Sequence, residues 1–315
     1  MNNLSEISNI LKKNDFFYIL THMYPDGDAL GSAFALCRAL QKCGKHAKFL
    51  YESPIPEKFK YLTEFVTEDN FDFKFIIAVD LADTSLLEPN FEKYKNKIDM
   101  SIDHHVSNKN YAKINFINSA AAANCEIIYK LLTEMNIIPD PEISSALYTG
   151  ISTDTGCFQY SNTTADTHSI TSELMKLGAS TEELNENLFL IKTPKKLELE
   201  KIIYKNLEFS FDSKCAITYV TLSEIGKIGI SDNELDGIAS IPIRIKGVKI
   251  GITLREKTEN CFKVSVRTSS DIDANDFCRH FGGGGHSRAG GFNISGDLIN
   301  VKNQISNKIK SVMEW

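Results

Sequence analysis

The segment DMSIDHH, residues 99–105, joins a short apolar run to an acid and two histidines. Three other segments also carry an aspartate, with or without a histidine, to the end of an apolar stretch: ILTHMYPDGDALGS (19–32), FIIAVDLADTS (75–85) and GISTDTGCF (150–158). One such triplet would be weak evidence, because short polar triplets occur by chance. Four segments that all offer carboxylate or imidazole ligands predict a shared metal site.

Apolar runs alternate with helical patterns around these segments. Strands are predicted at 16–20, 47–52, 73–82 and 97–103, where the runs are typical of strands buried on both faces of a parallel sheet. Helices are predicted at 4–13, 29–44, 125–136, 141–152, 164–178 and 181–190, with Asn124 capping the third. The alternation predicts a doubly wound α/β domain, in which ligands bind beyond the carboxyl ends of the strands.

The last third of the chain has a different pattern. A charged helical stretch at 193–209 precedes short strands at 215–221, 248–256 and 261–268, of which the last two are predicted to form a hairpin. Helical patterns at 231–240, 273–281 and 297–313 and a glycine-rich stretch, GGGGHSRAGG (282–291), complete it. A chain of 315 residues favours two domains. We predict a first domain at 1–190, a helical linker at 191–206 and a smaller α/β domain at 207–315.

Composition limits the possible partners. The net charge is −6, with −7 over residues 1–205 and +1 over 206–315, whereas proteins that hold long duplex DNA are normally basic. No apolar run approaches the ~18 residues of a membrane span, and the N-terminal residues do not resemble a secretory signal. Seven cysteines without a Cys-x-x-Cys motif favour reduced thiols. We expect a cytoplasmic protein that binds neither membranes nor long duplexes.

The candidate metal ligands are His22, Asp26, Asp28, Asp80, His104 and Asp154. Four carboxylates and two imidazoles exceed the needs of one catalytic zinc. They suit two divalent ions ~3.5–4 Å apart, bridged by a carboxylate and a water. Oxygen and imidazole donors without a thiolate favour Mn²⁺, and Mg²⁺, Co²⁺ and Fe²⁺ are also compatible. Because such ions acidify water and bind phosphate oxygens, phosphoester hydrolysis is the predicted reaction.

Each segment also has an ordinary structural explanation. PDGD (25–28) is typical of a turn, Asp80 and Asp154 could cap helices, and His104 could be a core histidine. Cys157, close to Asp154, is more typical of a small buried residue than of a ligand. Four such coincidences would be needed together, so the metal site is the preferred interpretation.

The motifs resemble those of the DHH phosphoesterase superfamily. The resemblance is carried by His22 to Ser32, Asp80, Asp103-His104-His105 and Thr153-Asp154. Gly282 to His286, with Arg267 upstream, resembles the DHH-associated substrate domain. Length and layout are most similar to the bacterial nanoRNase/pAp-phosphatase (oligoribonuclease) subgroup of cytosolic enzymes. These act on very short oligoribonucleotides and on 3′-phosphoadenosine 5′-phosphate (pAp), and some relatives hydrolyse cyclic di-AMP or its linear product pApA.

The resemblance implies a role for each residue. One ion would be held by His22 and Asp26, and the other by Asp28, His104 and Asp154, with Asp80 bridging them. His105 would face the scissile phosphate as donor or leaving-group acid, and Asp103 would orient a histidine. Arg267 would bind a phosphate, and Gly284, Gly285 and His286 would approach the nucleotide. The substrate would lie in a cleft between the domains.

Several alternatives stay open at this point. Family II inorganic pyrophosphatases and exopolyphosphatases share the first-domain motifs but differ in the second domain. RecJ-type exonucleases are longer and carry added DNA-binding modules, and the membrane-anchored cyclic-dinucleotide phosphodiesterases have spans that are absent here. A catalytically inactive nucleotide sensor on the same fold is a further alternative. The sequence does not decide between dinucleotide, pAp, pApA and cyclic dinucleotide, and a homodimer is expected only from the family.

Overall fold

The computed structural model describes residues 3–67, 70–230, 232–235, 237–269, 271–285 and 287–312. The chain divides into two compact units, Met1–Ile191 and Lys192–Trp315. Among the helices of the described ranges, none is both long enough and apolar enough to cross a membrane.

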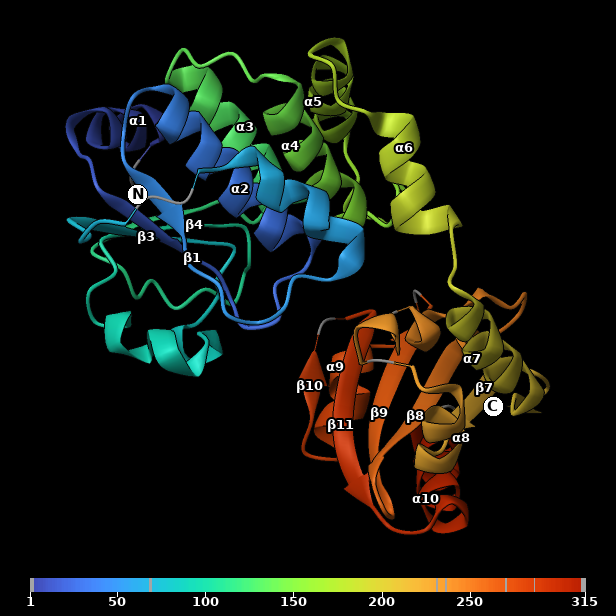
Figure 1. The fold of residues 1–315 in the computed structure, drawn as a ribbon. Coiled ribbons are helices and arrows are strands. Elements are labelled where there is room, and N and C mark those ends of the chain that lie inside the picture. The colour runs from blue at the N-terminus through green and yellow to red at the C-terminus, as the bar shows by residue number, and fades with distance from the viewer. Residues whose placement is uncertain are drawn as a thin grey trace. The chain divides into compact units, whose positions relative to one another are not determined.

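The first unit is built on a parallel sheet of five strands (Figure 1). The strands are β1 (Phe17–Leu20), β2 (Ala47–Phe49), β3 (Phe75–Val79), β4 (Met100–Asp103) and β5 (Ile114–Ile117), in the order β2-β1-β3-β4-β5. This confirms the predicted doubly wound sheet. The strand order reverses between β1 and β3, which is the switch point where such sheets bind ligands. Strand β5 was not predicted, because its four residues are all only half-buried and carry no continuous apolar run.

Helices cover one face of this sheet, and short 3-10 helices cover the other (Figure 1). The helices are α1 (Leu4–Lys13), α2 (Gly27–Lys42), α3 (Asn124–Glu134), α4 (Pro141–Asp154), α5 (Ala165–Lys176) and α6 (Thr181–Asn185). A 3-10 helix at Glu57–Phe65 packs beside α2, whereas those at Thr84–Leu86 and Pro89–Tyr94 belong to the opposite face. Leu30, Phe34 and Leu147 are buried on the helical face, and Leu20 and Ile76 on the other. Both faces are therefore closed, as a parallel sheet requires.

Helix α2 begins two residues earlier than predicted. Asp26 is its N-cap, and the Asp26 Oδ1 accepts hydrogen bonds from the backbone N–H groups of Asp28 (3.0 Å) and Ala29 (3.1 Å). A carboxylate in this position satisfies N–H groups that have no partner inside the helix. Asp28 consequently lies in the first turn of the helix and not in the preceding loop.

The prediction that Asn124 caps α3 is wrong. Asn124 is the first residue of the helix, and its N–H donates to Asp28 Oδ2 (2.6 Å) while that of Cys125 donates to Asp28 Oδ1 (2.9 Å). The cap is thus supplied by a distant side chain, which local sequence patterns do not reveal. The same contact fixes the carboxylate of Asp28 between α2 and α3.

Helices α2 and α4 approach each other closely at Gly150. A Cβ atom at this position would lie 2.2 Å from the Cys125 Sγ and 2.7 Å from the Asp28 Oδ1. We expect Gly150→Ala to destabilise the protein by about 1–3 kcal/mol, because an added methyl group in a close-packed interior forces its neighbours to move. It should also weaken divalent-metal binding, since Asp28 is one of the displaced groups.

Urea unfolding and Mn²⁺ titration of the same variant test this expectation. Gly226→Ala is the matched control, because Gly226 lies in the helix α8 (Leu222–Ile228) and a Cβ there would meet nothing within 4 Å. The free energy of unfolding of that control should rise by up to about 1 kcal/mol, because alanine has a higher helix propensity than glycine. Unchanged stability and metal affinity in Gly150→Ala would contradict the close approach.

Asp140 links the same two helices by charge. It caps α4 through the N–H of Ile143 (2.9 Å) and pairs with Arg38 (2.9 Å) and Lys42 (2.6 Å) of α2. Burial alone would raise the pKa of Asp140, but the hydrogen bonds from Arg38 and Lys42 outweigh it and lower the pKa to about 2. A depressed carboxyl pKa stabilises the folded state above the unfolded value of 3.8, and the gain is lost as pH falls toward 2.

We expect Asp140→Asn to lower the free energy of unfolding by about 2 kcal/mol at pH 7 and by roughly half of that at pH 3. Asparagine also caps helices well, so the change isolates the charge. Denaturant unfolding at both pH values measures the difference. The control is Asp166→Asn, which removes an exposed ion pair with Lys130. Its free energy of unfolding should fall by less than about 1 kcal/mol. A pH-independent loss in Asp140→Asn would contradict the charge argument.

The second unit contains a mixed sheet of six strands. They are β6 (Glu208–Ser210), β7 (Cys215–Val220), β8 (Ile250–Thr258), β9 (Cys261–Thr268), β10 (Gly284–Gly285) and β11 (Ala289–Ser295), in the order β10-β11-β9-β8-β7-β6. β7 and β8 are parallel, and the other pairs are antiparallel. The predicted hairpin is confirmed, with Thr258 opposite Cys261. The pattern at 231–240, by contrast, forms only 3-10 turns at Asp232–Leu235 and Ile238–Ser240 within its described part.

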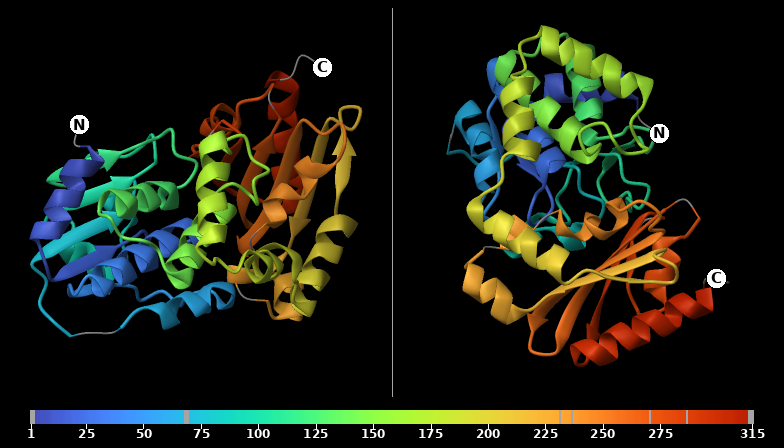
Figure 2. Two further views of the ribbon diagram at one scale, coloured as in Figure 1. Left: turned by 90° about the horizontal axis from the view of Figure 1, so that it is seen from above. Right: turned by 90° about the vertical axis from the view of Figure 1, so that its right-hand side faces the viewer.

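Helices cover this second sheet as well (Figure 2). The sheet packs against α9 (Ala274–Arg279) and α10 (Leu298–Val312) in one apolar cluster that includes Phe277 and Ile305. A separate cluster contains α7 (Pro194–Lys205), which buries Leu199 and Ile203 with Val220 of β7. Helix α7, the charged stretch between the two predicted domains, therefore packs within the second unit.

Candidate metal centre

Strand ends supply the first group of predicted ligands. His22 follows β1 by two residues, Asp80 follows β3 directly, and Asp103 ends β4 immediately before His104 and His105. Because the carboxyl ends of parallel strands meet at one edge of the sheet, these side chains converge. β1 and β3 also flank the switch point.

Helix ends supply the remaining ligands. Asp26 and Asp28 lie at the start of α2, and Asp154 is the last residue of α4. Asp80 has a left-handed backbone, with φ of 52°, and the following 3-10 turn is capped by Asp83 instead. Neither Asp80 nor Asp154 caps a helix among the described residues, so the ordinary explanation for these two acids does not hold.

The structure brings all six predicted ligands together in overlapping sets. The ligand atoms within each set lie within 4.8 Å of one another: His22, Asp26 and Asp80; Asp28, His104 and Asp154; and Asp80, His104 and His105. The Nε2 atom of His104 lies 3.5 Å from Asp80 Oδ1, 3.6 Å from Asp154 Oδ2 and 3.8 Å from Asp28 Oδ2. The Nε2 of His22 lies 3.9 Å from Asp80 Oδ2. Asp80 is thus shared by two sets, one with His22 and Asp26 and the other with His104 and His105.

Hydrogen bonds set the orientation of the histidine rings. The Nδ1 of His22 lies 3.0 Å from the carbonyl oxygen of Met23, and the Nδ1 of His104 lies 3.3 Å from that of Ala121. A carbonyl only accepts, so each Nδ1 carries the proton and each Nε2 presents a lone pair to the carboxylates. This is the arrangement in which histidine ligates a metal.

His105 is oriented differently, by Asp103. The buried Asp103 accepts hydrogen bonds from the His105 Nδ1 (2.8 Å) and from Asn108 (2.6 Å). Burial alone would raise the pKa of Asp103, but these hydrogen bonds outweigh it and lower the pKa, and the same bond raises the pKa of His105. An ionised Asp103 only accepts, so the Nδ1 of His105 carries a proton and its Nε2 is left for another partner.

The carboxylates at this edge repel one another. Burial, and after it the charges of neighbouring aspartates, raise the pKa of Asp80 well above its usual value; for Asp154 burial and the same repulsion raise it to about 9. The buried Asp80 Oδ1 has no hydrogen-bond partner among the described residues. An unpaired buried carboxylate is costly, and divalent cations would supply the missing positive charge. Oxygen and imidazole donors in this number fit such ions.

Two polar side chains, the exposed Asn162 and the buried Glu126, support the site without having been predicted. The Asn162 Nδ2 donates to the carbonyls of Ala122 (3.0 Å) and Asp154 (3.1 Å). Glu126, which is 1% exposed, accepts the Ala122 N–H at 3.3 Å. Asn162 thus ties the loop that orients His104 to the end of α4, and Glu126 ties the same loop to α3. No local sequence pattern distinguishes Asn162, because its partners are backbone atoms from distant segments.

The predicted substrate residues of the second unit lie on neighbouring strands. Arg267 of β9 is opposite Ala289 of β11, and Gly285 is opposite Gly290, one residue further along β11. Gly285 has a φ of 148° and lies so close to β11 that a Cβ would be 2.3 Å from the Ala289 oxygen, so packing alone requires glycine there. At Gly284 a Cβ would meet only Asn275, at 3.5 Å. His286 lies outside the described residues.

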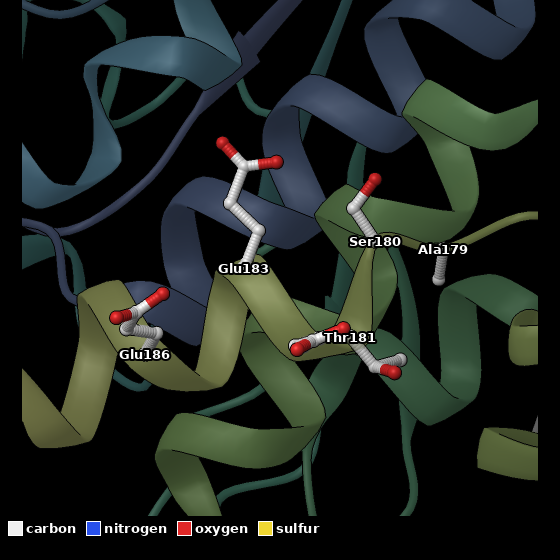
Figure 3. Close-up of a pocket in the computed structure, with 6 residues that line it drawn as sticks. Ala179, Ser180, Thr181, Glu183 and Glu186 are labelled. Carbon is white, nitrogen blue, oxygen red and sulfur yellow. The ribbon is translucent and has the colours of Figure 1, made fainter.

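A pocket of about 450 Å³ lies at the start of α6 (Figure 3). Its lining consists of Ala179, Ser180, Thr181, Glu182, Glu183 and Glu186. None of the predicted metal ligands contributes to it, and three glutamates would repel a phosphate. The pocket is therefore a poor candidate for a nucleotide site.

Comparison with family models gives two matches. Residues 17–151 match the N-terminal domain of the DHH family, and residues 212–314 match the DHHA1 domain. The first match contains the metal-ligand segments up to α4, and the second contains Arg267 and the glycine-rich stretch.

Individual relatives resemble the chain over most of its length. A Thermus thermophilus protein named bifunctional oligoribonuclease and PAP phosphatase NrnA is 27% identical, over 89% of this chain and 84% of that protein. An uncharacterized protein of Mycoplasma genitalium is 30% identical, over 99% and 94%. A crystal structure of an exopolyphosphatase-related protein from Bacteroides fragilis has the same fold, with a TM-score of 0.88 at 23% identity over 98% and 96% of the two chains. The chain belongs to the DHH family, with a DHH domain in its first unit and a DHHA1 domain in its second.

Proposed function

We propose that this protein is a metal-dependent phosphoesterase that hydrolyses very short oligoribonucleotides, including pApA, to mononucleotides, pAp to AMP, or both. The observation that carries the proposal is the convergence of six residues with oxygen or imidazole donors, among them the buried Asp80, whose Oδ1 has no hydrogen-bond partner in the part of the chain that the structure describes. Relatives named oligoribonuclease and PAP phosphatase support the substrate class. A cytoplasmic location and a homodimer stay predictions.

Two ions, with Mn²⁺ preferred, are assigned to this site. His22 and Asp26 would hold one, and Asp28, His104 and Asp154 the other, with Asp80 between them; the overlapping ligand sets support this division. When bound, such ions lower the pKa of water and neutralise phosphate charge. The shared Asp80 makes the two ions depend on each other.

The chain's own side chains would then act on the phosphate. His105, held by Asp103 through its Nδ1, is left with Nε2 to donate a hydrogen bond to a phosphate oxygen or a proton to the leaving group. The carboxylate of Asp103 keeps the ring in one orientation. In the second unit, Arg267 would bind a terminal phosphate, and Gly284 leaves space for a close approach.

A substrate panel tests the proposal. The full chain is assayed with pApA, pAp, cyclic di-AMP, a longer oligoribonucleotide and polyphosphate, in Mn²⁺ and in chelator, and products are identified by chromatography. We expect metal-dependent release of mononucleotides, with rates that fall as the oligonucleotide lengthens. Hydrolysis of polyphosphate alone would replace the proposal by a polyphosphatase, and tight pApA binding without turnover in Mn²⁺ would indicate a sensor.

Arg267→Ala is expected to reduce kcat/KM for pApA by about 10- to 150-fold, the value of a charge-assisted hydrogen bond to phosphate. The loss should be far smaller for an aryl phosphodiester, which lacks a terminal phosphate. The Lys263→Ala variant is the control, since Lys263 is an exposed cation on the same strand. Equal losses on both substrates would show that Arg267 supports folding or the metal site instead.

A further inference from the structure

A tyrosine stands exposed in the middle of the metal-ligand loop. Tyr24 is 70% exposed and lies between His22 and Asp26. It is two peptide units from each, so its Cα is at most about 7.6 Å from theirs. The ring of Tyr24 lies in water beside a candidate catalytic centre. It belongs to neither apolar cluster of the first unit, so packing of the core does not explain it.

The backbone at Tyr24 is strained. Its φ is 57°, in the left-handed region that bulky residues rarely adopt, and the following residue is Pro25, which restricts it further. Such a conformation persists only where the surroundings fix it, and it is concentrated at ligand sites.

Contacts on both sides hold the loop in this conformation. The Met23 N–H donates to the Leu86 carbonyl at 2.7 Å, the His22 ring bonds the Met23 carbonyl, Pro25 is buried and Asp26 caps α2. The ring of Tyr24 is therefore carried by a rigid segment, and little ordering remains to be done when a ligand binds.

Further apolar side chains are exposed near the same strand ends. Met23 is 38% exposed, Leu86 is 47% exposed and Val106 is 89% exposed. The carbonyl of Leu86 accepts the hydrogen bond from the Met23 N–H, and Val106 follows His105 in the chain. Most of the charged groups in the candidate ligand sets are carboxylates, so bound cations, with His105, would hold a phosphate there, and the exposed apolar side chains offer a surface beside them. A ligand that places a phosphate on the cations and a planar apolar group beside them matches both features.

We propose that Tyr24 is a stacking platform for the nucleobase next to the scissile phosphate, with Met23 and Leu86 as its apolar border. The inference rests on the proposed function and adds a base-binding subsite to the first unit. A π-face contact accepts any base, so the subsite favours nucleotides over base-free phosphodiesters without selecting a sequence.

The test compares kcat/KM for a diribonucleotide and for its abasic analogue in the Mn²⁺-loaded full chain. Tyr24→Phe keeps the ring and should keep the wild-type ratio of the two values. Tyr24→Asn and Tyr24→Gly remove the ring but tolerate the left-handed backbone, and the ratio should fall about 5- to 150-fold, chiefly through KM of the diribonucleotide. Tyr204→Ala, which removes a tyrosine that is 58% exposed on α7, is the control.

The outcomes separate this inference from the function on which it rests. A wild-type protein that hydrolyses neither substrate would refute the proposed function. An active wild type whose Asn and Gly variants keep the wild-type ratio would refute the stacking platform alone. A loss shared equally by both substrates would also refute it, because the ring would then serve the loop or its metal ligands.

Discussion

Asp80→Asn is expected to abolish hydrolysis of pApA, with a loss of about a thousandfold or more, because both proposed ions would lose the ligand that they share. Asparagine keeps the shape of the side chain and tolerates the left-handed backbone at this position, where φ is 52°. The change therefore removes the charge and leaves the end of β3 intact.

The variant also has an expected effect without metal. Wild-type Asp80 is a buried carboxylate whose Oδ1 has no hydrogen-bond partner within the described ranges, and it is surrounded by Asp28, Asp26 and Asp154. Removing its charge relieves this repulsion, so in chelator Asp80→Asn should be at least as stable as the wild type. Added Mn²⁺ should raise the melting temperature of the wild type much more than that of the variant.

Asp83→Asn is the matched control, since Asp83 lies three residues away, caps the following 3-10 turn, pairs with Lys109 and belongs to none of the candidate ligand sets. Asp154→Ala, which should weaken one ion, is expected to recover partly at raised Mn²⁺. Near wild-type turnover by Asp80→Asn in chelated buffer would contradict the two-ion assignment, whatever the stability of the variant.

The sequence predicted the ligands because each segment that carries them adjoins an element that has a strong apolar pattern. β3 and β4 are buried throughout and β1 is buried except for the half-buried Tyr18. The parallel arrangement brings their carboxyl ends together without any knowledge of loops. The hydrolytic proposal could therefore be formed before the packing was known. What the pattern could not supply was the orientation of each ring and carboxylate.

The features that were missed depend on contacts between distant segments. Asp28 caps α3 across 96 residues, and Asn162 joins two backbone carbonyls from separate segments. The glycine-rich stretch was explained by close approach to a ligand, whereas at Gly285 the neighbouring strand alone requires glycine. Such features arise from packing and leave no periodic signal in the chain.

His105 raises the question of whether it binds a metal or the substrate. Its ring lies in one of the candidate ligand sets, with the Nδ1 atom 3.5 Å from the Asp80 Oδ1. The same Nδ1 lies 2.8 Å from Asp103, whose pKa is lowered, so a proton occupies that nitrogen. A protonated nitrogen offers no lone pair to a cation. The geometry therefore favours contact with the substrate through Nε2.

His105→Ala is accordingly expected to keep both ions and lose about 10²- to 10⁴-fold in kcat for pApA, the usual value of a positioned acid or hydrogen-bond donor. Elemental analysis of the purified, Mn²⁺-loaded variant measures the first expectation, and steady-state kinetics the second. His46→Ala is the control, because His46 pairs with Asp15 and stacks on Phe16 at the opposite, amino ends of the strands. Finding one Mn²⁺ fewer in His105→Ala than in the wild type would make His105 a metal ligand. It would also contradict the assignment of a proton to the His105 Nδ1 that faces Asp103.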